Sequence, residues 1–260
     1  MKRLVKRVFR VVLPVLLAGG VAVVSGSTPG ADESSVPPPH EYTFAKIIYT
    51  NFGGNLDGYR RRNSWYTDSP AAEAHFMQGV RRLTRIDADS QATYIKLTED
   101  RLFNYPFLYA VEVGHWALDD KECELLREYL LRGGFLMVDD FHGTQEWEVF
   151  MDSMRRVFPD RSIVEIGNQE EVLHVLYDLD QRIQIPGLTA VMRGMTYEKD
   201  GYTPHWRGIY DDDGRLMVSI NFNMDMGDAW EHADNPIYPQ PMTALAYRFG
   251  INYIIYSMTH

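Results

Sequence analysis

The sequence has little cysteine and no long uninterrupted apolar segment near its start. Of its 260 residues only Cys123 is a cysteine, which excludes an internal disulfide and leaves stability to the hydrophobic core. The apolar run of residues 11–24 is broken by Pro14, Gly19 and Gly20, and it is shorter than the roughly 20 residues of a membrane-spanning helix. No cysteine follows that run directly, so we expect no bacterial lipoprotein attachment.

Positive charge is also scarce, with 26 basic against 36 acidic residues and a formal net charge of -10. Five of the basic residues lie within residues 1–10, so removal of that stretch changes the charge from -10 to -15. Binding of nucleic acid phosphates requires charge of the opposite sign. We therefore expect no nucleic-acid partner.

The N-terminal region has the layout of a secretory signal: a basic stretch, an apolar run and then small residues. We predict a cleaved signal peptide over residues 1–26, and hence a bacterial protein exported to the periplasm or beyond the cell. Residues 27–41 are rich in Ser, Pro and charge and are predicted to form a flexible leader. Contact with a membrane is expected only through a signal segment that stays uncleaved.

Residues 42–260 alternate β-branched or aromatic runs with helical periodicity, which predicts a single α/β domain. The expected strands are residues 45–50, 92–97, 107–113, 135–140 and 162–166, with two more around an Asp/Gly turn in 205–223. The expected helices are residues 69–85, capped by Ser69, 118–134, with the capping box Asp119/Glu122, 144–159 and 241–260. The nearly continuous apolar character of 107–113 indicates a strand inside a mostly parallel sheet.

Polar residues gather where the predicted strands end. Asn51, His115, Asp140 and Asp225 each come after a different strand, the last together with Asn223, and the carboxyl ends of parallel strands meet at one edge, where ligands bind. We expect these four groups to share one hollow. The alternative is that polar residues follow any strand as it leaves the core. Asp139, if its side chain points inward, is expected to be satisfied by hydrogen bonds from backbone donors alone.

Two groups of charged residues at this edge suggest chemistry. Asp140 and His142 form a carboxylate and imidazole pair with a candidate catalytic acid/base role. Arg60, Arg61 and Arg62 lie in a Gly-rich loop and suit a ligand with a carboxylate or phosphate, although a solvated turn explains them too. Asn51, His115 and Asn223 are candidate ligand contacts.

The stretch "NMDMGDAWEHAD", residues 223–234, is densely acidic. Asp228 and Glu231 have the spacing of a capping box and are predicted to cap a helix. Asp225 and His232 are not explained by capping and offer oxygen and nitrogen ligands for a divalent metal, the one cofactor that we consider. Trp230 is a further candidate ligand contact. No specific metal motif such as HExxH supports the metal.

Several long motifs resemble the exported family called domain of unknown function 4159 (DUF4159). They are "YPFLYAVEVGHWALDDKECELLREYLLRGGFLMVDDFHG", "VFPDRSIVEI", "HWRGIYDDDGRLMVSINFNMDMGDAWEHADNP" and "TALAYRFGINYIIYSMTH". The resemblance implies a class I glutamine amidotransferase-like fold, a flavodoxin-like three-layer sandwich, without an established reaction. Members are often encoded near MoxR-type ATPases and von Willebrand factor A-like proteins, which implies a role in an envelope-associated assembly.

Glutaminase activity is disfavoured, because such enzymes need a nucleophilic cysteine at a tight turn between strand and helix. The corresponding turn here reads "VDDFHG", and Cys123 is predicted to be a core residue inside a helix. Three functions stay open. The favoured one is a non-catalytic module that binds envelope proteins or a polar small molecule such as a glycan. The others are a metal-assisted hydrolase of a carbohydrate or peptide-like envelope substrate and a structural subunit of a membrane complex.

Overall fold

A computed structural model describes residues 40–52 and 63–260 of the chain. The predicted signal peptide, the leader up to residue 39 and Arg60, Arg61 and Arg62 lie outside the described residues. The central sheet has seven strands in the order β3-β1-β4-β6-β9-β8-β7. In that order the strands are Thr93–Lys96, Ala45–Ile48, Phe107–Val111, Phe135–Asp139, Leu216–Phe222, His205–Tyr210 and Val164–Glu165. A small antiparallel pair, β2 (Thr50–Asn51) with β5 (Trp116–Ala117), lies outside this sheet.

The sheet is mostly parallel, as predicted. Strands β3, β1, β4, β6 and β9 pair in parallel, whereas β8 pairs antiparallel with both of its neighbours, β9 and β7. The carboxyl ends of β1, β4, β6 and β9 therefore lie along one edge of the sheet. The predicted strand at 162–166 shrinks to two exposed residues, because β7 is an edge strand that pairs with β8 alone.

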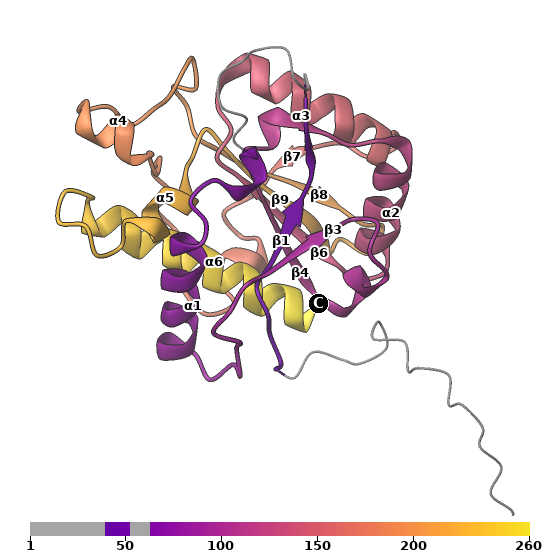
Figure 1. Ribbon diagram of the computed structural model, residues 1–260, viewed down its shortest axis with the longest axis horizontal. Helices are drawn as coiled ribbons and strands as arrows, with labels where there is room; N and C mark the ends of the chain where they lie inside the picture. Colours follow the sequence, from indigo (N-terminus) through magenta and orange to yellow (C-terminus); the bar gives the residue numbers. More distant parts are fainter. Residues whose placement is uncertain (1–39, 53–62) are drawn as a thin grey trace, which may run out of the picture. The chain divides into compact units, whose positions relative to one another are not determined.

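Helices cover both faces of the sheet (Figure 1). The α-helices are α1 (Ala71–Leu83), α2 (Asp120–Leu131), α3 (Gly143–Val157), α4 (Leu188–Met192), α5 (Met226–Glu231) and α6 (Gln240–Thr259). Short 3-10 helices are η2 (Ser64–Tyr66), η3 (Asp100–Asn104), η4 (Val113–His115) and η5 (Glu171–Leu173). None of the helices in the described part of the chain is long and apolar enough to cross a membrane.

Side chains of the inner strands alternate between two apolar cores, as the period of a strand requires. Phe107 and Tyr109 of β4 pack with residues of α1, α5 and α6, whereas Leu108 and Ala110 pack with residues of α2 and α3. Burial of each large apolar side chain contributes about 1.5–3 kcal/mol. The domain is thus an α/β three-layer structure of the flavodoxin-like kind.

Helix starts show where local signals hold and where tertiary contacts override them. Asp119 and Glu122 form the predicted capping box of α2, with hydrogen bonds of 2.8 and 2.9 Å. The prediction that Ser69 caps α1 is wrong, because the cap position is Pro70 and the Ser69 hydroxyl instead contacts the buried Lys46 and Glu73. The Ser69 hydroxyl accepts a hydrogen bond from the buried Lys46 ammonium group instead of from a backbone N–H group of α1.

Candidate functional site

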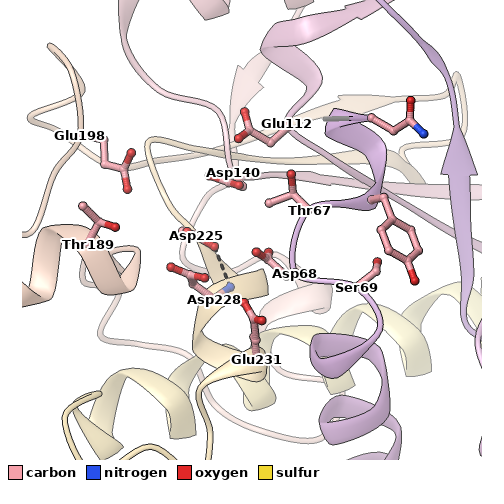
Figure 2. A pocket seen from close by; sticks show the side chains of 12 residues that line it. Thr67, Asp68, Ser69, Glu112, Asp140, Thr189, Glu198, Asp225, Asp228 and Glu231 are labelled. Atoms are coloured by element: carbon pink, nitrogen blue, oxygen red, sulfur yellow. Dashed lines mark hydrogen bonds between the residues drawn. The ribbon is translucent and has the colours of Figure 1, made fainter. Parts of the chain in front are cut away.

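A polar cavity of about 590 Å³ lies beyond the carboxyl ends of the parallel strands. Seven carboxylates line it, and no Lys, Arg or His is among the lining residues in the described part of the chain. The carboxylates are those of Asp68, Glu112, Asp140, Glu198, Asp225, Asp228 and Glu231; Asn63, Tyr66, Thr67, Ser69 and Thr189 complete the wall. Figure 2 shows Glu198 and Thr189 on one side of this hollow and Ser69 on the other. We call this cavity the acidic pocket.

Unusual backbone conformations concentrate at the acidic pocket. Among the described residues, five that are not glycine have positive φ angles: Asp68 (63°), Glu112 (54°), Asp140 (53°), Lys199 (51°) and Asn223 (63°). The first three line the pocket, Lys199 follows Glu198, and Asn223 lies two residues before Asp225. Left-handed conformations of such residues are uncommon and cluster at functional sites, because the surrounding structure must offset their cost.

The loop before α1 brings Asp68 into the pocket. Lys46 of β1 is buried below this loop and donates hydrogen bonds to the Thr67 carbonyl oxygen (2.7 Å), Ser69 Oγ (2.7 Å) and Glu73 Oε1 (2.9 Å). These bonds hold the residues on both sides of Asp68. One carboxylate oxygen of Asp68, Oδ2, is buried without a hydrogen-bond partner. The loop therefore presents an unsatisfied acceptor beside the other carboxylates.

Helix α5 supplies two more carboxylates, and its cap differs from the prediction. The cap is Asp225, whose side chain accepts from the Asp228 backbone N–H at 2.7 Å (Figure 2). The predicted capping box of Asp228 and Glu231 is wrong, because α5 starts at Met226 rather than after Asp228. Asp139 from β6 makes this earlier start favourable, since its Oδ2 accepts from the N–H groups of Met226 (2.8 Å) and Gly227 (3.1 Å). Asp139 thus accepts from backbone donors as expected, but the expectation that these alone satisfy it is wrong, because the Tyr109 hydroxyl also donates to Oδ2 (3.2 Å) and Oδ1 is buried without a partner.

Asp225, Asp228 and Asp68 offer one oxygen each within 4.8 Å of one another. Gly187 closes this group from the opposite side. A methyl group at position 187 would lie 2.7 Å from Asp225 Oδ2, 2.7 Å from Glu198 Oε1 and 3.1 Å from Asp228 Oδ2. The space between these oxygens is therefore open because glycine at position 187 has no side chain.

Asp140 and His142 are in contact, as their spacing suggested. His142 Nε2 lies 3.2 Å from Asp140 Oδ1, and both residues are buried. Asp140 lines the acidic pocket, whereas His142 lies behind it, with Nδ1 buried and without a partner. Burial lowers the pKa of His142, which favours the neutral imidazole.

A second acidic group lies beside the pocket and contains its own cations. Glu146 of α3 accepts from Lys199 and from the His142 backbone N–H (2.6 Å), and its Oε1 lies 3.1 Å from His115 Nε2. His115 also lies 3.3 Å from Glu112. Burial alone would raise the pKa of Glu146, but the hydrogen bonds from His115, Lys199 and the backbone outweigh it and lower the pKa to about 2.

In the acidic pocket the pKa values move in the opposite direction. Burial, with repulsion from Asp140 as the next cause, raises the pKa of Glu112 to about 9. Burial also raises the pKa values of Asp68, Asp140 and Asp225 well above their ordinary range, and the neighbouring carboxylates add to it. Each raised value means that bringing another negative charge into this pocket is unfavourable.

Four predicted ligand contacts lie outside the lining of the pocket: Asn51, His115, Asn223 and Trp230. Trp230 is fully buried and stacks on Phe76 with ring centroids 4.2 Å apart, so the prediction that it contacts a ligand is wrong. Asn223 is buried, and its amide accepts from the Gly143 N–H (2.9 Å) and donates to the Thr203 oxygen (2.7 Å). Asn51 of β2 donates to Ser64 Oγ at 2.9 Å.

Of the four strand-end groups expected to share one hollow, Asp140 and Asp225 line it, while Asn51 and His115 do not. The tryptophan was misassigned because its place in an acidic stretch suggested exposure. His232, the other predicted metal ligand, forms a separate group with Asp228 and Glu231, with ligand atoms within 4.8 Å of one another. Cys123 is buried in α2, as predicted.

Sequence reasoning did not assign Asp68, Glu112 or Glu198 to the site, and it predicted Ser69 only as a helix cap. Glu112 follows β4 directly, and the strand-end argument that selected His115 applies to it equally. Asp68 and Glu198 carry no local signal, because one precedes a helix and the other lies in the long connection between β7 and β8. Only the folded chain brings them to the ends of the strands.

The chain matches one family model over nearly all of the described domain. That model covers residues 43–258 and carries the description "Domain of unknown function (DUF4159)". A comparison with curated proteins gives no match. Because the match spans well over half of the sequence, the chain belongs to the DUF4159 family.

Proposed function

We propose that this protein is an exported binding module of the bacterial envelope whose acidic pocket holds a divalent cation and, next to it, a polar ligand. The observation that carries the proposal is the concentration of carboxylates and left-handed backbone at one cavity without a basic lining residue among the described ones. The concentrated carboxylates and the left-handed backbone both cost folding free energy. A bound cation offsets the cost of the carboxylates.

The donor atoms suit a hard cation. Asp68, Asp225 and Asp228 offer oxygens within 4.8 Å of one another, a spread that fits Ca²⁺ with its oxygen ligands at about 2.3–2.6 Å. Softer metals prefer sulfur or imidazole ligands, which the lining of the pocket lacks in the described residues. We therefore expect Ca²⁺ or Mg²⁺ to bind better than Zn²⁺ in the pocket.

The cavity of about 590 Å³ is far larger than an ion and falls in the range of small-molecule sites. The remaining wall offers hydroxyl groups of Thr67, Ser69 and Thr189 together with the Glu198 carboxylate. Such donors and acceptors suit a ligand rich in hydroxyl groups, and a glycan of the envelope has that chemistry. The location of the protein in the envelope rests on the signal-like N-terminus and is part of the proposal.

Calorimetric titration of the purified domain with CaCl₂ tests the cation. Asp225→Asn keeps a good helix cap while it removes a charge, and we expect Ca²⁺ affinity to fall at least about tenfold. Gly187→Ala removes no charge but places a methyl group among the carboxylate oxygens, so it should weaken binding as well. Asp152→Asn, at an exposed carboxylate of α3, is the matched control and should bind like the unaltered protein. Absence of Ca²⁺ and Mg²⁺ binding to the unaltered protein would refute the proposal.

A metal-assisted hydrolase is the second candidate, favoured by the contact between Asp140 and the buried His142. Asp140 would then accept a proton from a water molecule in the pocket, and His142 would orient it. Hydrolysis of envelope glycans or peptides by the Ca²⁺-loaded protein, lost in Asp140→Asn although Ca²⁺ still binds, would favour this candidate over the binding module.

A further inference from the structure

A second cavity, of about 520 Å³, lies between α1 and α6 and shares no lining residue with the acidic pocket. Its lining includes Arg82 and Leu83 from α1, Tyr247, Arg248 and Ile251 from α6, and Tyr177. We call it the α1–α6 groove. Its chemistry is opposite to that of the acidic pocket, because its ionised side chains are guanidinium groups.

Two arginines of the groove have no acidic partner. Most arginines of the described residues form ion pairs, as Arg101 does with Glu99 and Arg215 with Asp211. Arg82 and Arg248 form none within the described part of the chain, and both are exposed. In a chain with a formal charge of -10, two unneutralised guanidinium groups at one cavity form a local positive site.

The rest of the groove combines apolar and aromatic side chains with the polar side chains of His75, Gln78, Gln240 and Thr243. Leu83 is 55% exposed at its rim, and Ile251 lies in its floor. The Arg248 guanidinium lies 6.0 Å from the centre of the Tyr177 ring, which also lines the groove. Burial, with the charge of Asp234 as the second cause, raises the pKa of Tyr247 to about 12.

Gly79 allows the two helices to form this surface. A methyl group at position 79 would lie 2.2 Å from the Tyr247 ring, so the glycine lets that ring lie against α1. The Tyr247 ring forms part of the wall of the groove, which Arg82 and Arg248 also line. An apolar wall with a few polar groups at the same cavity is typical of a small-molecule site, and here Arg82 and Arg248 are the charged groups in the lining.

We propose that the α1–α6 groove binds an amphipathic anion, an alkyl chain that carries one phosphate or carboxylate head group. The guanidinium groups of Arg82 and Arg248 match such a head group, because their donors form paired hydrogen bonds with its oxygens. The alkyl chain lies against Leu83, Ile251 and the two tyrosine rings. This site is independent of the cation in the acidic pocket.

Calorimetric titration with decyl phosphate below its micelle concentration tests the groove. The double variant Arg82→Gln/Arg248→Gln should weaken binding at least about tenfold, since charged hydrogen bonds to the head group are lost. Arg193→Gln is the matched control, because Arg193 is exposed, forms no ion pair among the described residues and lies outside the groove. Inorganic phosphate should bind at least tenfold more weakly than decyl phosphate.

Ala244→Trp gives a second test that leaves both arginines in place. Ala244 is exposed on α6 and lines the groove, so an indole there should fill the space for the alkyl chain without disturbing the core. We expect loss of decyl phosphate binding with an unchanged melting temperature. The proposal is overturned if the unaltered protein binds neither decyl phosphate nor decanoate, if both variants bind as before, or if binding occurs only to phosphatidylglycerol vesicles.

Discussion

The buried and half-buried carboxylates of this domain include two groups, which differ in whether the chain itself supplies a cation. Glu73 is paired with the buried Lys46 at 2.9 Å, and Glu146 is paired with Lys199 and His115. Asp68 and Asp225 have no cationic side chain in contact among the described residues, although they lie in the same part of the fold. We call these sets the paired and the unpaired carboxylates.

The difference shows what each set does in the protein. A buried charge is tolerated when a partner and hydrogen bonds replace water, so the paired carboxylates hold segments in place without any ligand. Burial first, and repulsion from neighbouring carboxylates second, raises the pKa values of the unpaired carboxylates, so their ionised forms are unfavourable without a cation. A pocket built in this way is ready for a cation that the solution provides.

The largest effect is expected where a paired carboxylate loses its cation. Lys46→Met leaves Glu73 buried beside an apolar side chain, and we expect a loss of about 3–5 kcal/mol in the free energy of unfolding. Urea denaturation measures it. The double variant Lys46→Met/Glu73→Gln removes the buried charge and should recover part of the loss. A loss below about 1 kcal/mol in the single variant would show that the pair is not needed.

Glu112, which lines the acidic pocket and lies 3.3 Å from His115, and the paired Glu146 should also give stability opposite dependences on pH. Glu112 has a pKa of about 9 instead of 4.5, so between these values the unfolded chain releases a proton that the folded chain keeps. Raising the pH from 5 to 8 should therefore lower the free energy of unfolding in chelator by about 4 kcal/mol, at about 1.4 kcal/mol for each pH unit. Glu146, with a pKa of about 2, contributes stability that is lost as the pH falls below 4.5.

Urea titrations at a series of pH values, with and without Ca²⁺, measure both the loss of stability at high pH and the loss at low pH. Ca²⁺ that binds only the folded chain should restore about 2.7 kcal/mol at pH 8 when its concentration is 100 times its Kd. If stability rises from pH 5 to pH 8 in chelator, the pocket does not carry the proposed electrostatic strain.

A smaller effect is expected from the removal of one unpaired charge. Asp140→Asn keeps a residue type that tolerates the left-handed conformation at φ 53°, and it lessens repulsion in the pocket. The free energy of unfolding at pH 8 without Ca²⁺ should rise by about 1 kcal/mol, while Ca²⁺ binds more weakly. Thermal unfolding and Ca²⁺ titration check this pair of changes. A loss of stability would instead indicate a structural role for the Asp140 carboxylate.

Some of the site was predictable because it follows from strand order. Asp140 and Asp225 come shortly after β6 and β9, and parallel strands bring their ends to one edge whatever the details of packing. Asp68 was not predictable, since its position depends on the buried Lys46 below its loop. The start of α5 was predicted wrongly for a similar reason, because Asp139 from another element caps its first N–H groups.

Apolar periodicity by itself determined the α/β class, the helix and strand ranges to within a few residues and the core position of Cys123. These properties depend on neighbours in sequence and on burial, which the chain records locally. Only the tertiary structure decided that Trp230 is buried, that Glu198 reaches the ends of the strands, and which carboxylates receive a cation. Charge pairing depends on distances between segments far apart in sequence, and those distances are set by the folded chain rather than by local sequence patterns.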